Sequence, residues 1–266
     1  KMNILALSIL SIGLYSFGTL YQLLIYLRKI QAKQFISLLL GTSAVALQLI
    51  VTLDYIINEN QILLGFFNTA SLILCFIVIC LLIFSAKKPL QTIFLAIYPI
   101  SAICIFGAFF FHDTQQSFSP SGSGIFIHII LSIIAYSVFS IAAIQAVLVY
   151  IQNNNLKKRN NTILIRNLPP LLTMESLLFE MIWSGTILLA LAIIFGFIFV
   201  DDLFAQHLAH KSILSILALA IFSTLLIGRK KYGWRGLTAS KWTLWGSSVL
   251  MIAFLGSKLA FEWLVH

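Results

Sequence analysis

Residues 124–151 read GIFIHIILSIIAYSVFSIAAIQAVLVYI, a run without a single charged side chain. A helix of about 20 apolar residues crosses the ~30 Å hydrocarbon core of a bilayer. The run is long enough for that, and we predict a transmembrane helix over 124–151. Its apolar residues are continuous rather than alternating with polar ones, which excludes a strand of a transmembrane β-barrel.

Seven further apolar runs accompany this one. They cover residues 3–27, 35–57, 62–86, 89–111, 177–200, 208–228 and 243–265. Composition agrees, because 60% of the 266 residues are hydrophobic, 9% are charged and the mean hydropathy is +1.01. Soluble domains are about 45–50% apolar and about 25% charged, so a soluble globular enzyme is excluded. We predict an all-α protein, a polytopic bundle of eight transmembrane helices that forms one integral membrane domain over residues 1–266.

The basic residues indicate how the helices are oriented. With eight spans, 14 of the 17 Lys and Arg residues fall on one side of the membrane, and Lys1, Lys211 and Lys258 fall on the other. Basic residues in short loops stay in the cytoplasm. We therefore expect both termini on the outer side. The net charge of +9 arises mostly from these basic residues on the cytoplasmic side, and we do not interpret it as a sign of nucleic-acid binding.

The longest predicted loop, residues 152–176, lies on the cytoplasmic side. Its Pro169 and Pro170 oppose helix formation there. Thr173 or Ser176 can cap the helix that follows, since Ser and Thr are favoured at that position.

Polar residues inside predicted spans are costly in lipid, so their positions are informative. Several predicted helices carry polar residues at helical spacing, which places them on one face. His128, Ser132, Tyr136 and Ser140 share a face of one helix, and Asn68 and Ser71 share a face of another. Two interpretations stay open. The side chains either line a ligand-binding cavity or form hydrogen bonds between helices that hold the bundle together.

All five histidines are predicted at outer helix ends or in outer loops. They are His112, His128, His207, His210 and His266. The orientation rests on Lys and Arg alone, so this clustering is an independent observation that predicts an outward-facing, histidine-lined cavity. Imidazole is a ligand of zinc, copper and haem iron. Zinc takes three or four ligands, and the segment from Asp201 to His210 contains enough candidate ligands for a zinc site to remain possible. Haem instead needs axial imidazoles and an apolar slot.

No catalytic motif accompanies these residues. The chain has no phosphate-binding loop, nucleophile elbow or zinc-protease motif. Its cysteines, Cys75, Cys80 and Cys104, lie inside predicted spans and form no CxxC pair. The sequence favours a protein without enzymatic activity of its own.

Several short motifs follow one another in an order typical of one membrane protein family. They are Phe67-Asn68-x-x-Ser71-Leu72, His128-x-x-x-Ser132-x-x-x-Tyr136, Leu168-Pro169-Pro170-Leu171-Leu172-Thr173-Met174-Glu175, His210-Lys211-x-x-Leu214-Ser215, Tyr232-Gly233-Trp234-Arg235-Gly236 and Phe254-Leu255-Gly256-Ser257-Lys258. From about residue 62 onward the chain resembles the cytochrome c assembly (CcsA/CcmC/HemX-like) family, most closely its YpjD branch. The resemblance implies an eight-helix protein of the bacterial inner membrane.

The better-known members of that family carry haem to the outer membrane face, where two histidines beside a tryptophan-rich segment hold the iron. By this resemblance His128 matches the first ligand and His266 lies near the second. Two departures are visible: residues 201–216 contain no Trp where the tryptophan-rich segment would fall, and Gln48 stands where relatives carry an intramembrane His. The first removes a stacking surface for haem, and the second removes a deeper iron ligand.

These observations lead to one expectation and one alternative. We expect an inner-membrane protein that binds or handles haem b in the histidine-lined cavity. The predicted site consists of His128 and His266 as iron ligands, together with His210, Ser132, Tyr136, Asn68 and Ser71. The alternative is a non-catalytic accessory or regulatory subunit of another membrane protein, such as a CorC/CNNM-type transporter. The expected partners are therefore the lipid bilayer, haem and another membrane protein, and not nucleic acid.

Overall fold

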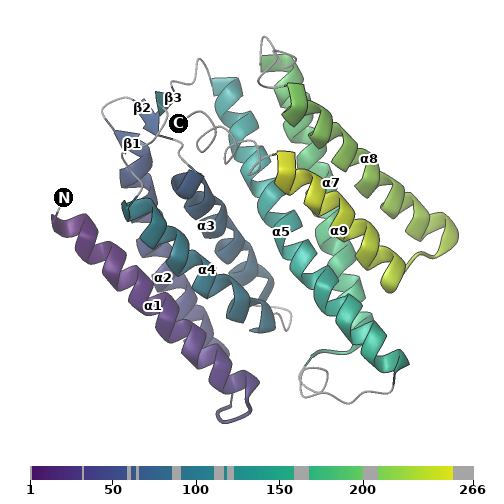
Figure 1. Cartoon of the computed structure of the whole chain (residues 1–266), viewed down its shortest axis with the longest axis horizontal. Helices are drawn as coiled ribbons and strands as arrows, with labels where there is room; N and C mark the ends of the chain where they lie inside the picture. Colours follow the sequence, from purple (N-terminus) through teal and green to yellow (C-terminus); the bar gives the residue numbers. More distant parts are fainter. Residues whose placement is uncertain are drawn as a thin grey trace. The chain divides into compact units, whose positions relative to one another are not determined.

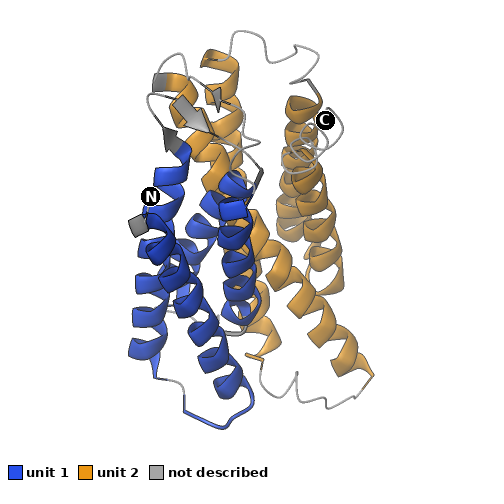
Figure 2. Cartoon of the chain, turned by 60° about the vertical axis from the view of Figure 1, so that its left-hand side comes forward, with its two compact units in different colours: residues 1–120 blue, residues 121–266 orange. Residues whose placement is uncertain are grey.

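The computed structural model describes residues 2–31, 33–58, 61–63, 66–85, 91–110, 117–118, 123–158, 168–199 and 209–253 (Figure 1). The chain divides into two compact units, Lys1–Pro120 and Ser121–His266, which Figure 2 shows in different colours. The described residues are overwhelmingly α-helical, which confirms the helical class. A single integral membrane domain over residues 1–266 stays a prediction.

The described part of the first unit is a bundle of four long helices. They are α1 (Met2–Tyr26), α2 (Gln34–Ile56), α3 (Phe66–Ser85) and α4 (Gln91–Phe110). Helix α1 packs against α2 and α4, and α3 packs against the same two helices. Between α1 and α4 the buried Tyr15 and Tyr98 rings have centroids 5.3 Å apart. Three very short strands pair antiparallel in the order β1 (Ile57–Asn58), β2 (Gln61–Leu63) and β3 (Ser117–Phe118), a feature that the hydropathy pattern does not predict.

The described part of the second unit is again built from helices. They are α5 (Ser123–Lys157), α7 (Leu171–Phe199), α8 (Ala209–Tyr232) and α9 (Leu237–Met251). Helix α5 packs along α7 and also contacts α9, while α8 contacts α7 and α9. The buried Phe139 and Phe222 rings are stacked with their centroids 3.9 Å apart. A side chain at Gly185 or Gly246 would press on these rings, so small residues allow the helices to pack closely.

Within the described residues, seven helices are long and apolar enough to cross a membrane, namely α1, α2, α3, α4, α5, α7 and α8. Each of them overlaps one of the first seven predicted runs, in the same order, although several helix ends differ. Large apolar side chains on these helices are exposed; Phe35 is 75% exposed, and Ile103 and Ile198 are each 65% exposed. Such a surface is unfavourable in water and favourable in a bilayer.

The predicted start of the eighth span at residue 243 is wrong. Helix α9 begins at Leu237, immediately after Gly236 turns the chain with a φ of 57°. Hydropathy locates the start of the apolar residues, whereas a helix can begin in the polar turn that precedes them. The described residues end at 253, so a span that reaches 265, the total of eight spans and the outer location of both termini stay predictions.

Other helix boundaries also differ from the predicted ones. Helix α3 begins at Phe66 instead of 62, because residues 61–63 form β2, and α8 continues to Tyr232, past the predicted end at 228. Helix α7 begins at Leu171 instead of 177, directly after Pro170. Proline is compatible with a helix start, because the first N–H groups have no intrahelical partner. Thr173 and Ser176 consequently lie inside α7 and do not cap it. Helix α5 continues to Lys157, past the predicted end at 151, because a helix need not stop where its apolar residues stop.

The membrane orientation can be tested at the two ends of α5. In a chain whose native cysteines are replaced by alanine, Asn154→Cys should resist a membrane-impermeant thiol reagent in intact spheroplasts, because the basic side is expected in the cytoplasm. Ser121→Cys should react. Lysed cells, in which both positions should react, provide the control. The opposite pattern in intact spheroplasts would contradict the orientation and, with it, the outer location of the histidines.

Candidate functional site

The first unit contains a fully buried network of polar side chains. Tyr15 of α1 donates its hydroxyl hydrogen bond to Gln48 Oε1 of α2. Gln48 Nε2 in turn donates to the Oγ and the carbonyl oxygen of Ser71 on α3, at 3.1 and 3.2 Å. Thr52 Oγ1 lies 2.8 Å from Ser71 Oγ. Each of these four side chains is at most 2% exposed, so the network holds three helices together.

This network occupies the hydroxyl of Ser71 with hydrogen bonds between helices. Ser71 and Asn68, predicted as site residues, are 1% and 0% exposed in the first unit. The Ser71 hydroxyl is engaged by Gln48 and Thr52. The helix-to-helix interpretation therefore describes Ser71, and its assignment to a ligand site stays a prediction, as does that of Asn68.

His128 lies in the second unit, in the second turn of α5 and against α7. Its Nδ1 is 2.7 Å from the carbonyl oxygen of Ala192. A carbonyl oxygen can only accept a hydrogen bond, so Nδ1 carries a proton, and in a neutral ring the lone pair is on Nε2. The hydrogen bond also fixes the orientation of the ring.

Two glycines allow α5 and α7 to approach at this point. A Cβ at Gly196 of α7 would lie 3.0 Å from both Cε1 and Nδ1 of His128. A Cβ at Gly124 of α5 would overlap the ring of Phe199 on α7. Each helix thus supplies a glycine against which a ring of the other helix lies. Phe199 also stacks with Phe195, their centroids 5.8 Å apart, so the end of this helix pair combines one imidazole with an aromatic surface.

The remaining polar residues of the α5 face point into protein. Tyr136 is 5% exposed and Ser140 is 9% exposed, which confirms for these two residues that the face is packed against protein. Ser132 is half-buried, and its hydroxyl donates to the carbonyl oxygen of His128 at 2.8 Å. The Ser140 hydroxyl likewise donates to the backbone carbonyl oxygen of Tyr136 at 2.9 Å. The serine hydroxyls thus bond within their own helix.

The other histidines contribute less to the described site. His210 is exposed in the first turn of α8. His112, His207 and His266 lie outside the described residues, so the outward-facing histidine cluster stays a prediction. Across the described part of the chain, no group of three or more His, Cys, Asp and Glu side chains could hold a metal ion.

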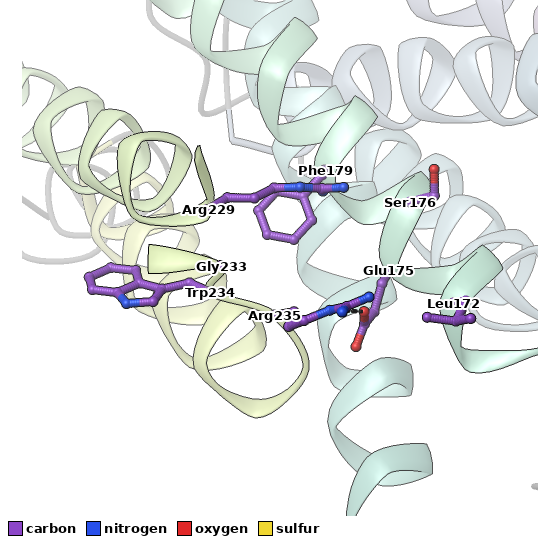
Figure 3. Close-up of a pocket in the computed structure, with 8 residues that line it drawn as sticks. All are labelled: Leu172, Glu175, Ser176, Phe179, Arg229, Gly233, Trp234 and Arg235. Atoms are coloured by element: carbon purple, nitrogen blue, oxygen red, sulfur yellow. Dashed lines mark ion pairs between the residues drawn. The ribbon is translucent and has the colours of Figure 1, made fainter. Parts of the chain in front are cut away.

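A second site, which the sequence motifs did not predict, lies at the other end of α7. A cavity of about 240 Å³ is lined by residues that include Glu175, Phe179, Arg229, Trp234 and Arg235. Arg235 Nε lies 3.6 Å from the Oε2 of Glu175, and the guanidinium of Arg229 lies 3.6 Å from the centroid of the Phe179 ring. Figure 3 shows both arginines directed toward α7 from the end of α8 and the turn after it.

The turn between α8 and α9 places Trp234 and Arg235. Gly233 and Gly236 on either side have φ angles of 67° and 57°, a left-handed conformation that side chains with a Cβ rarely adopt. A Cβ at Gly236 would also overlap the Asn153 side chain and lie 3.4 Å from Glu175 Oε1. This explains why glycine is required at both positions of Tyr232-Gly233-Trp234-Arg235-Gly236.

Amide side chains of α5 hold the start of α7. Gln152 Nε2 donates to the carbonyl oxygen of Pro169 at 2.9 Å, and Gln145 Nε2 donates to that of Met174 at 3.1 Å. Two motifs that are far apart in the sequence, one at the start of α7 and one between α8 and α9, thus meet in one pocket. A signal was available, because a Glu beside a predicted span and an Arg in another loop on the same side are a candidate pair.

Sequence comparisons place the chain among known proteins. Residues 36–265 match the model of the family described as "Cytochrome C assembly protein". The chain is 26% identical to the inner membrane protein YpjD of Escherichia coli K12 over 216 residues, which are 81% of each protein. It is 32% identical to the protein HemX of Brevibacillus brevis over 131 residues, which are 48% of each. No solved structure matches.

Proposed function

We propose, since this chain belongs to the cytochrome c assembly protein family and is a multi-pass protein of the bacterial inner membrane, that it binds haem with His128 as an iron ligand. The single observation that carries the proposal is the hydrogen bond from His128 Nδ1 to the Ala192 carbonyl oxygen at 2.7 Å. Histidines that bind metals characteristically donate their other ring N–H to a carbonyl or carboxylate, which fixes the tautomer and the ring orientation.

The surroundings of His128 suit a flat, apolar ligand with a central metal. Phe195 and Phe199 provide aromatic surface on α7, and 44% of Phe199 is exposed. Haem would supply an iron that the His128 imidazole could coordinate and a flat apolar macrocycle that aromatic side chains could contact. One well-oriented imidazole beside aromatic rings meets this requirement. We assign the second axial position to His266 or His210.

Haem is favoured over zinc by the number of ligands that the site provides. A zinc site takes three or four protein ligands at short distances. Around His128 the described residues offer a single imidazole, and no three-residue metal cluster occurs among them. Haem iron could be held by fewer protein ligands than zinc, so the His128 imidazole would be sufficient in the described part of the site.

The proposal is tested by absorbance of the purified protein. Expressed with ample haem and isolated in detergent, the protein should show a Soret band. His128→Gly should lose this band, and imidazole added in solution should restore it by occupying the vacated position. His112→Gly, a histidine outside the proposed ligand set, serves as the matched control and should keep the band. Loss of the band in His210→Gly or in His266→Gly would identify the second ligand.

Two outcomes would contradict the proposal. A colourless protein despite ample haem would exclude haem binding under these conditions. Retention of the full Soret band in His128→Gly would exclude His128 as the ligand. A colourless protein that co-purifies with a second membrane protein would instead support the accessory-subunit alternative.

A further inference from the structure

The pocket at the start of α7 is unrelated to the His128 site. Ala192, the hydrogen-bond acceptor of His128, and Glu175 of the pocket lie on the same continuous helix. At a rise of about 1.5 Å per residue they are about 26 Å apart along its axis. That distance is close to the ~30 Å thickness of the hydrocarbon core. The two sites therefore face opposite surfaces of the membrane, and one ligand cannot occupy both.

The pocket carries an excess of positive charge. Two guanidinium groups and one carboxylate line it, and the carboxylate, Glu175, already faces Arg235. Arg229 is held against the face of the Phe179 ring, an arrangement that stabilises a cation and restricts its position. A planar guanidinium fixed in this way is preorganised to donate two parallel hydrogen bonds to a phosphate or carboxylate.

The surroundings of the pocket place it at the level of lipid headgroups. It lies where α7 and α9 begin and α8 ends. Tyr232, Trp234 and Trp242 form an aromatic series beside it, with centroid distances of 6.2 and 5.3 Å. Tyr232 is 74% exposed, as is 67% of Leu172 on the pocket wall. Tyr and Trp concentrate at membrane interfaces, where one part of the side chain is apolar and the other is hydrated.

We propose that this pocket binds the headgroup phosphate of an anionic phospholipid, with Arg229 as the principal contact and Arg235 beside it. The pocket volume of about 240 Å³ accommodates a phosphate with part of a headgroup. Basic pockets at the ends of membrane helices recognise such headgroups. A soluble anion would leave the exposed Leu172 and Tyr232 in water, whereas a lipid covers them with its chains.

The test compares lipids that differ only in headgroup charge. The full-length protein in neutral detergent is mixed with phosphatidylglycerol or with phosphatidylcholine of the same acyl chains, and bound lipid is counted by native mass spectrometry. One phosphatidylglycerol molecule should bind at least about tenfold more tightly than phosphatidylcholine, which corresponds to about 1.4 kcal/mol. Arg229→Gln should remove this preference.

Lys230→Gln is the matched control, because Lys230 is the next residue, is exposed and carries the same charge. It should retain the preference. An equal loss in both variants would show that general surface charge attracts the lipid and would overturn the proposal. Equal binding of the two lipids by the wild-type protein would also overturn it, even if Arg229→Gln does not fold. In a last experiment, inorganic phosphate is added as a competitor. Displacement of the lipid by millimolar phosphate would assign the site to a soluble anion instead.

Discussion

Replacing Gly196 with valine should abolish haem absorbance about as completely as removal of His128, although Gly196 carries no ligand atom. Even a Cβ at this position would lie only 3.0 Å from two atoms of the imidazole ring, and the valine methyl groups extend further. The ring must move away from α7, which breaks the 2.7 Å hydrogen bond to the Ala192 carbonyl oxygen. Without that bond neither the tautomer nor the direction of Nε2 is fixed.

Gly185→Val provides a matched control for this variant. Gly185 lies on the same helix, and its added Cβ would be 3.0 Å from the ring of Phe139. Overpacking of this kind costs typically about 1–3 kcal/mol at either site. Both variants should therefore unfold at a lower temperature in detergent, whereas only Gly196→Val should lose the Soret band. Loss of the band in both variants to the same degree would attribute it to general destabilisation and contradict the positioning role of Gly196.

Replacing Gln48 with leucine should destabilise the first unit by about 1–3 kcal/mol, the cost of leaving buried polar partners without their hydrogen bonds. Gln48 is 0% exposed and connects Tyr15 with Ser71. Leucine removes both the acceptor for the Tyr15 hydroxyl and the donor to Ser71. The loss should appear as a lower midpoint in thermal or denaturant unfolding of the detergent-solubilised protein.

The double variant Gln48→Leu/Tyr15→Phe should recover part of this loss, because it removes the hydroxyl that the single variant leaves without its acceptor. Thr42→Val on the same helix is the control. Its hydroxyl is exposed and bonds to the Leu38 carbonyl oxygen within the helix at 2.8 Å. A Gln48→Leu protein as stable as the wild type would show that the network contributes nothing to the packing of α1, α2 and α3.

Hydropathy predicted the described helices well, because exclusion of polar groups from lipid acts over a whole span of about 20 residues. It was less accurate where helices leave the hydrocarbon. Helix α7 begins directly after Pro170, and α9 begins directly after Gly236. Both starts depend on local backbone geometry. A single residue sets that geometry, and an average over 20 residues cannot detect it.

In the candidate sites, too, some residues could be predicted from the sequence, whereas their contacts could not. His128 could be selected from its spacing with Ser132 and Tyr136, since residues four apart share a helix face. Its actual partner could not be selected, because the Ala192 acceptor is a backbone carbonyl, and every residue has one. The pocket with Glu175 and Arg235 was not predicted, although the two residues were a candidate charge pair on one side of the membrane. The two residues are distant in sequence, and their ion pair depends on how α7 packs beside the turn between α8 and α9.

Helix α7 runs without interruption from Leu171 to Phe199, with Glu175 near its first turn and Gly196 near its last. An α-helix is stiff along its axis, because every turn is braced by backbone hydrogen bonds. A displacement of α7 along that axis at one membrane surface would therefore arrive at the other surface almost undiminished. A shift of α7 that moves Glu175, the partner of Arg235, therefore also moves the Ala192 carbonyl oxygen that orients the imidazole of His128 at the other membrane surface.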